Sequence, residues 1–234
     1  MWILYTEYRT LMALLHKIET TPDLVDQVYR KLLDAISEGT LQPGARMTQE
    51  DIAEQLAVSR QPVHQALRLL KQDGFVIDAP GRGVLVAPLD VAWLANVYQV
   101  RSALDALAAR LACAGRFEFN ADLMAQGRKA ARGKNISAMI EADMDFHTAI
   151  YTAANNPLIA QSAQQHWRHI RRAMGAVLQS AKIRAAVWDE HEAIARAIAA
   201  KDSAQAEALM RGHGEQASRH MGNQLHTVLS AAAI

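Results

Sequence analysis

The chain lacks several features that would place it in other classes of protein. Its 234 residues contain one cysteine, Cys113, which excludes an intrachain disulfide framework and fits a cytoplasmic protein. No run reaches the roughly 18 uninterrupted apolar residues of a membrane span. The apolar opening at residues 1–5 has neither the cationic start nor the cleavage site of a signal peptide. The formal net charge is only +1, so any case for nucleic acid depends on local arrangement.

What is present indicates a globular protein of two domains. The chain is 50% hydrophobic and 21% charged, which is ordinary for globular proteins. Its length exceeds what a single core of ~100 to 200 residues commonly serves. We expect an extension of unknown role at 1–20, a first domain at 21–88 and a second at 90–234.

The first domain is predicted to contain three helices and a hairpin. Apolar residues recur at helical spacing from residue 23, and Thr48 and Asp51 have the spacing of a capping box. Ser59 is a suitable N-cap for a third helix, which Gly74 ends. The predicted elements are helices beginning near residues 23, 48 and 59, and a two-stranded hairpin at 75–77 and 84–86.

The third helix separates apolar and polar residues onto opposite faces. At 100° per residue, its apolar side chains fall within one arc of about 100° and its polar ones on the other side. Arg60 and Gln61 at its start suit the major groove, where Arg binds guanine and Gln binds adenine, while Arg68 suits a phosphate. The alternative is a face that only meets water. Net charge does not distinguish a DNA-binding face from a solvated one, because residues 23–89 hold seven basic and nine acidic side chains.

The motifs of residues 22–88 resemble the winged helix of the GntR family of bacterial regulators. They are GTLQPG at 39–44, IAEQL at 52–56, VSRQPV at 58–63 and ALRLL at 66–70, followed by Gly74 and by GRG at 81–83. The resemblance implies that Arg60 and the hairpin tip contact DNA. His64 and Gln65 stand where the family usually has Arg and Glu, which puts the usual operator sequence in doubt. The predicted DNA-binding residues are Ser59, Arg60, Gln61, His64, Arg68, Gly81 and Arg82.

The second domain is predicted to be an antiparallel bundle of helices. From residue 90 onward the only proline is Pro157, alanine is abundant and no strand is convincing. The predicted helices are 90–116, 121–132, 136–154, 158–180, 182–200 and 203–229. The expected fold class is therefore mainly α, with a winged helix-turn-helix domain followed by an all-α antiparallel helical bundle.

Histidines in this bundle have the spacing of a metal site. Asp143 and His147 are four residues apart, so both project from one face of a helix. His191 and His213 each lie eleven residues from Asp202, the predicted turn, so two antiparallel helices would place them at one height. Three imidazoles and a carboxylate would suit a divalent transition metal. The alternatives are a chance pair on a solvated face and histidines that complement helix dipoles.

Residues 90–228 resemble the FCD effector domain of the FadR branch of the GntR family. The resemblance rests on Asp143 and His147 with Phe146, on EHEAI at 190–194 and on residues 206–213. It implies that Asp143, His147, His191 and His213 bind a metal, with zinc as first candidate and nickel or manganese as others. It also implies a small carboxylate effector, and six helices resemble the smaller, VanR-like subgroup.

Two further sets of residues are candidates for the effector pocket. Arg101 is a second anchor for a carboxylate, with a surface ion pair as the alternative. The basic and aromatic cluster at 166–172 could line the pocket, but we expect a solvated helix face. Trp167 and Trp188 are expected in the core or in the pocket wall.

Together these patterns predict a homodimeric regulator, a repressor, that binds a pseudo-palindromic DNA operator. The effector would change the pose of the two winged helices through the short linker at 87–89. Two alternatives use the same four residues: a metal-dependent enzyme and a metal-ion sensor. The enzyme would need a base or nucleophile beside the centre, and the sequence shows no such arrangement.

Overall fold

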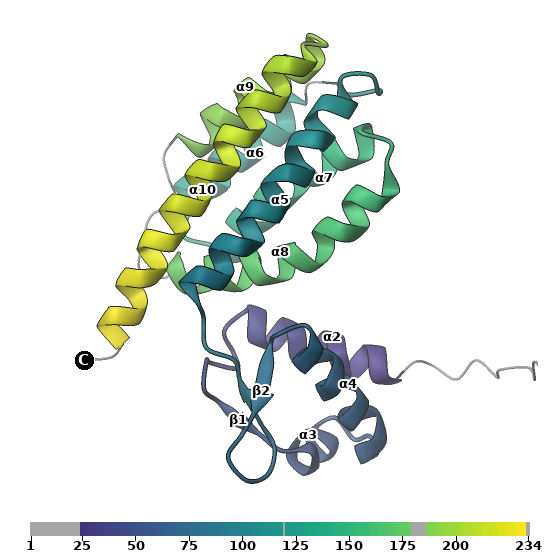
Figure 1. The fold of residues 1–234 in the computed structure, drawn as a ribbon, viewed down its shortest axis with the longest axis vertical. Coiled ribbons are helices and arrows are strands. Elements are labelled where there is room, and N and C mark those ends of the chain that lie inside the picture. Colours follow the sequence, from purple (N-terminus) through teal and green to yellow (C-terminus); the bar gives the residue numbers. More distant parts are fainter. Residues whose placement is uncertain (1–23, 119, 179–185, 233–234) are drawn as a thin grey trace, which may run out of the picture.

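The computed structural model describes residues 24–118, 120–178 and 186–232. The extension expected at residues 1–20 lies outside them. Figure 1 shows a bundle of long helices joined to a smaller unit of short helices and strands. Within these residues the chain has nine helices and three strands, which confirms the expected fold class. None of these helices combines the length and the apolar character needed to cross a membrane.

The smaller unit is built from α2 (Leu24–Ser37), α3 (Gln49–Gln55) and α4 (Arg60–Gln72). Thr48 caps α3 as expected, since its hydroxyl accepts the N–H of Asp51 at 3.2 Å. Gly74 ends α4 in the left-handed region at φ +79°, a conformation that side chains other than glycine rarely adopt. The three helices and Phe75 enclose a core of their own, which includes Ile36, Val63, Leu70 and Phe75.

The sheet has one strand more than the expected hairpin. The strands β2 (Val76–Asp78) and β3 (Val84–Val86) form the hairpin, and β1 (Arg46–Met47) pairs with the other edge of β3. All pairs are antiparallel, in the order β1-β3-β2. The prediction missed β1 because two residues are too few to show an alternating pattern. Gly83 permits this pairing, because a Cβ there would lie 2.3 Å from the Met47 carbonyl oxygen.

The bundle contains the six helices expected. They are α5 (Val91–Ala112), α6 (Ala121–Arg132), α7 (Ile136–Ala153), α8 (Pro157–Val177), α9 (Val187–Ala199) and α10 (Ser203–Ala232). Asn120, Asn135 and Asn156 cap α6, α7 and α8 with their side-chain oxygens, which explains the breaks at these asparagines. Helix α10 runs along α5 (Figure 1) and comes close where Gly214 faces Ser102.

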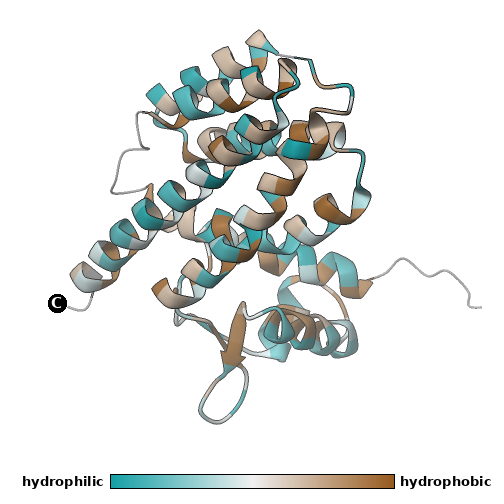
Figure 2. Ribbon diagram, turned by 45° about the horizontal axis from the view of Figure 1, so that its top comes forward, coloured by the Kyte–Doolittle hydropathy of each residue, from teal (hydrophilic) through white to brown (hydrophobic). Residues whose placement is uncertain are grey.

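The apolar faces of these six helices meet in a second core. This core includes Phe146, Ile150, Trp188, Ile194 and Leu225, all nearly or fully buried. Figure 2 shows the pattern behind it, because the helices carry hydrophobic and hydrophilic residues in separate stripes. The buried thiol of Cys113 packs here, and burial raises its pKa, as expected for an inert cysteine.

Candidate metal centre and nucleic-acid interface

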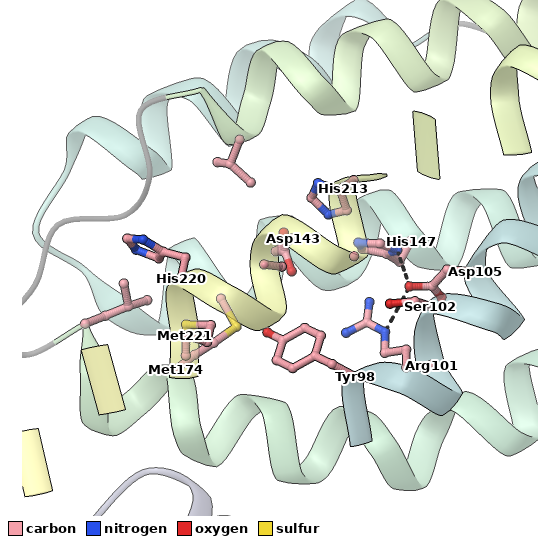
Figure 3. A pocket seen from close by; sticks show the side chains of 14 residues that line it. Tyr98, Arg101, Ser102, Asp105, Asp143, His147, Met174, His213, His220 and Met221 are labelled. Atoms are coloured by element: carbon pink, nitrogen blue, oxygen red, sulfur yellow. Dashed lines mark ion pairs between the residues drawn. The ribbon is translucent and has the colours of Figure 1, made fainter. Parts of the chain in front are cut away.

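Three histidines from three helices meet inside the bundle. His147 of α7, His191 of α9 and His213 of α10 are buried, and one ring nitrogen of each lies within 4.8 Å of the others. His191 and His213 face each other as the spacing predicted, with 3.4 Å between their Nε2 atoms. Figure 3 shows His147 and His213 on one side of a cavity. We call these three histidines and Asp143, the fourth predicted ligand, the metal centre, as a name for the predicted site.

Asp143 adds a carboxylate to the three imidazoles. It lies one helical turn before His147 on α7, and its Oδ1 is 3.5 Å from His191 Nε2. Three imidazole nitrogens and one carboxylate oxygen are the donor set that zinc and similar divalent metals prefer. Burial lowers the pKa of His147 well below its usual value, and Arg101 lowers it further. His147 is therefore neutral, which is the form that binds metal.

Two carboxylates lie behind the histidines. His213 Nδ1 is 2.9 Å from Glu190 Oε2, and His147 Nδ1 is 3.5 Å from Asp105 Oδ2. The carboxylate on His213 Nδ1 favours the tautomer with the proton there, which leaves its Nε2 to face His191. His147 Nδ1 is buried and makes no hydrogen bond with the described residues. The residues present thus fit a metal ion.

Asp105 is a residue of the cavity wall that the sequence reasoning missed. It is buried at the meeting point of three side chains. Tyr151 donates a hydrogen bond to it, and Arg101 Nε and His147 Nδ1 lie 3.1 Å and 3.5 Å from its Oδ2. A signal was available, because Asp105 is four residues from Arg101 and Tyr151 is four residues from His147. Both spacings place two side chains on one helix face.

Arg101 is buried, so the expected alternative of a surface ion pair is wrong. Its side chain is 4% exposed, and its guanidinium lies 3.4 Å from the centre of the Trp167 ring. Burial works to lower the pKa of Arg101, but Asp105 and other groups outweigh it and raise the pKa. Trp167 and Trp188 are both buried in the core, as expected.

A cavity of about 60 Å³ adjoins the metal centre. Its polar lining residues are Tyr98, Arg101, Ser102, Asp105, Asp143, His147, His213 and His220 (Figure 3). Four of these eight, Arg101, Asp143, His147 and His213, were predicted from the sequence as site residues, and the structure brings them to one cavity.

The polar face of α4 is exposed and its apolar face is buried, as expected. Val63, Ala66, Leu67 and Leu70 are at most 4% exposed. The exposed residues include Ser59 at the N-cap, then Arg60, Gln61, His64, Gln65 and Arg68. The hydroxyl of Ser59 makes no capping bond, so Ser59 occupies the expected position without the expected interaction.

The hairpin tip lies beside this face and is braced from β1. Gly81 and Arg82 are exposed at the tip, and Arg46 Nη2 donates to the carbonyl oxygens of Pro80 at 3.0 Å and of Arg82 at 2.6 Å. Arg60 makes an exposed ion pair with Glu50 at 2.9 Å. His64 Nδ1 is 3.0 Å from Gln49 Nε2. We call Ser59, Arg60, Gln61, His64, Arg68, Gly81 and Arg82 the DNA-reading surface.

The cluster at residues 166–172 does not lie on a solvated face. Arg168 Nη1 donates to the Tyr29 hydroxyl at 2.8 Å, and Arg171 Nη2 to Glu38 at 3.1 Å. Tyr29 in turn donates to Asp73, the residue that ends α4. One side of α8 is thus attached to α2 and to the end of α4, and the expectation is corrected. The sequence could not show this, because the partners lie more than 100 residues away along the chain.

His169 and Arg172 complete the contact between α8 and the smaller unit. The His169 ring stacks on Phe75 with 4.4 Å between centroids, and Arg172 donates to the carbonyl oxygen of Ala87 in the linker. Burial, with help from Arg172, lowers the pKa of His169 to about 4. His169 is therefore neutral at neutral pH.

Comparisons with known proteins match both parts of the chain. Residues 24–86 match the family described as bacterial regulatory proteins, gntR family, and residues 96–216 match the FCD domain. A transcriptional regulator of Streptomyces ambofaciens is 30% identical over 80% of this chain and 80% of its own length. The transcriptional repressor RspR of Escherichia coli is 27% identical over 59% of this chain and 63% of its own. The solved structure of Escherichia coli McbR shares the fold, with a TM-score of 0.71 at 22% identity over 88% of this chain and 99% of that one.

Proposed function

Since the chain belongs to the gntR family of bacterial regulatory proteins and carries an FCD domain, we propose that it is a transcriptional regulator controlled by a small carboxylate. Family and relatives are transcription regulators, so the chain is not an enzyme and the metalloenzyme alternative is set aside. Residues 21–88 form the DNA-binding domain in this proposal, and residues 90–234 the sensing domain.

The DNA-reading surface contacts a pseudo-palindromic operator in the cytoplasm, with one winged helix of a homodimer on each half-site. Arg60 and Gln61 at the start of α4 contact bases, Arg68 contacts phosphate, and Gly81 and Arg82 follow the neighbouring groove. The exposure of all seven residues supports this assignment. Repression is the expected outcome, in keeping with the name of the related RspR.

The metal centre binds a divalent cation, zinc in the first place, through Asp143, His147, His191 and His213. A bound cation offers a carboxylate an oxygen-binding position in a buried site, and Arg101 supplies a positive charge beside it. The carboxylate of Glu190 on His213 Nδ1 supports this proposal, because it orients that ring for a cation.

The observation that carries the proposal is the position of α8 between the cavity and the DNA-binding domain. Trp167 and Met174 face the cavity side, where Trp167 packs on Arg101 and Met174 lines the cavity. Arg168 and His169, the next residues along α8, contact Tyr29 and Phe75 of the DNA-binding domain. A ligand that moves α8 therefore also moves the contact that holds the end of α4.

The test measures operator binding by fluorescence anisotropy, using zinc-loaded protein and acids selected by thermal shift. A ligand at a hundredfold its dissociation constant stabilises the protein by ~2.7 kcal/mol, so acids that bind can be recognised by a rise in the melting temperature. We expect a bound acid to change operator affinity by about 5- to 150-fold, as is usual for coupled sites. Arg168→Ala should shrink this change while the acid still binds, whereas Arg219→Ala, on an exposed face of α10, should leave it intact.

Two results would contradict this proposal. If acids bind but leave operator affinity unchanged, the coupling through α8 is wrong. If chelation of the metal changes operator affinity and no acid does so, the chain is a metal-ion sensor.

A further inference from the structure

The cavity beside the metal centre has two chemically different ends. Arg101, Asp105 and His147 lie at one end, and Met174 and Met221 lie at the other (Figure 3). The apolar end is lined by Met174, Leu178, Val187, Ala217 and Met221. A ligand that fills this cavity must therefore be polar at one end and apolar at the other.

We propose that the effector is a short monocarboxylic acid with an apolar tail, an inference that rests on the proposed function. The carboxylate lies at Arg101 and the metal centre, and the tail lies against Met174 and Met221. A hydroxylated or second charged end would lose its water against a wall that is apolar apart from His220 and the Tyr98 hydroxyl, which weakens binding. An apolar tail strengthens binding by about fourfold for each methylene group buried.

Arg101 is arranged to hold one carboxylate. Its Nε lies 3.1 Å from Asp105 Oδ2, while Figure 3 shows its two terminal nitrogens toward the open part of the cavity. The Trp167 ring supports the guanidinium from one side, so its planar fork is fixed in place for a carboxylate. Among the described residues that line the cavity, Arg101 is the only arginine or lysine. A second carboxylate on the same ligand would have no such partner.

The size of the cavity restricts the tail to a few carbons. A volume of about 60 Å³ holds a few water molecules, given that one water needs roughly 10 to 15 Å³. The apolar end can lengthen, because methionine has three rotatable bonds and adapts its shape readily. Met174 and Met221 can therefore turn aside for a short chain without a change in the backbone. His220 and the hydroxyl of Tyr98 are polar groups on this side of the cavity in Figure 3, and the second carboxylate of a dicarboxylate would have to rely on them.

The experiment compares two matched series of acids on full-length, zinc-loaded protein by titration calorimetry. Butanoate, hexanoate and octanoate are set against the dicarboxylates of the same length, succinate, adipate and octanedioate. We expect affinity to rise by about fourfold per methylene group along the first series until the cavity is full. Each dicarboxylate should bind at least about tenfold more weakly than the monocarboxylate of equal length.

Variants of the apolar wall make the test specific. Val187→Thr keeps the shape of the side chain and adds a hydroxyl, and Met221→Gln adds an amide. Both should weaken hexanoate several-fold and leave butanoate nearly unchanged, whereas Met139→Gln, a buried position outside the cavity lining, should affect neither acid. Circular dichroism checks the fold, and Val187→Thr decides alone if Met221→Gln does not fold.

The outcomes separate this inference from the function on which it rests. If acids bind without dependence on chain length, or if dicarboxylates bind more tightly, the apolar tail is wrong and the carboxylate effector stands. If no carboxylate binds, or if Arg101→Gln leaves binding unchanged, the proposed carboxylate effector fails as well.

Discussion

The DNA-reading surface and the metal centre are built in opposite ways. The residues of the surface lie within 59–82, and the side chains of α4 and the hairpin tip point into solvent. The metal centre draws His147, His191 and His213 from three helices, and these histidines are 2%, 0% and 6% exposed. Side chains on the surface are therefore free to change with little effect on folding, whereas those of the centre serve folding and binding together.

Packing explains why the centre cannot change as freely. The His191 ring stacks on Phe146 with 4.0 Å between centroids, and Trp188 packs edge-on against it at 4.7 Å. Removal of the His191 imidazole leaves a cavity and takes away the ring that lies 3.5 Å from Asp143 Oδ1 and 3.4 Å from His213 Nε2. Arg60 on the surface, by contrast, has only an exposed partner in Glu50.

The largest effect is expected when a histidine of the centre is removed. Structural zinc sites gain roughly 10–16 kcal/mol from about four ligands, so His191→Ala should weaken zinc binding by about two to three orders of magnitude. A competition titration against a chromophoric chelator measures this loss. His226→Ala, at an exposed position on α10, is the matched control. Unchanged zinc affinity in His191→Ala would show that His191 is not a metal ligand. The inference that this buried residue serves both folding and binding would then be wrong.

The next effect belongs to the DNA-reading surface. Arg60→Ala should weaken operator binding by about 5- to 150-fold, the range of one bidentate contact to a base. Its free energy of unfolding should stay within about 0.5 kcal/mol of the parent, because the side chain is exposed. Anisotropy and urea unfolding measure the two quantities on the same samples, with Arg219→Ala as control. A loss of stability as large as the loss of affinity would show that the two regions do not differ as we infer.

The same difference decides what the sequence could predict. The two faces of α4 and the turn at Gly74 follow from neighbours in sequence, so they were predicted correctly. The meeting of His191 and His213 was also predictable, since the turn at Asp202 fixes the register of α9 and α10. Contacts set by the packing of distant helices were not, which is why Asp105 and the docking of α8 were missed. The strand β1 was missed for a local reason, its length of two residues.

The smallest effect is expected at the contact between the two domains. Its measurement tests whether this contact stabilises the protein independently of the metal. Stacked on Phe75, His169 has a pKa of about 4, below its usual value of 6.5, because burial and Arg172 disfavour its charged form. The unfolded chain therefore binds the proton more readily. The stability that neutral His169 contributes is complete above pH 6.5 and is lost as the pH falls toward 4.

His169→Phe keeps an aromatic ring on Phe75 and removes the titrating group. Metal-free protein is used, so that release of metal in acid does not contribute. Between pH 7.5 and pH 5, the free energy of unfolding of the parent should fall by on the order of 1 kcal/mol more than that of the variant, allowing for partial exposure of the ring. Groups that face His169 in both proteins, such as Asp73 and His166, cancel in this difference. Equal losses in acid would mean that His169 is protonated without cost, and that its stacking on Phe75 does not hold the domains together.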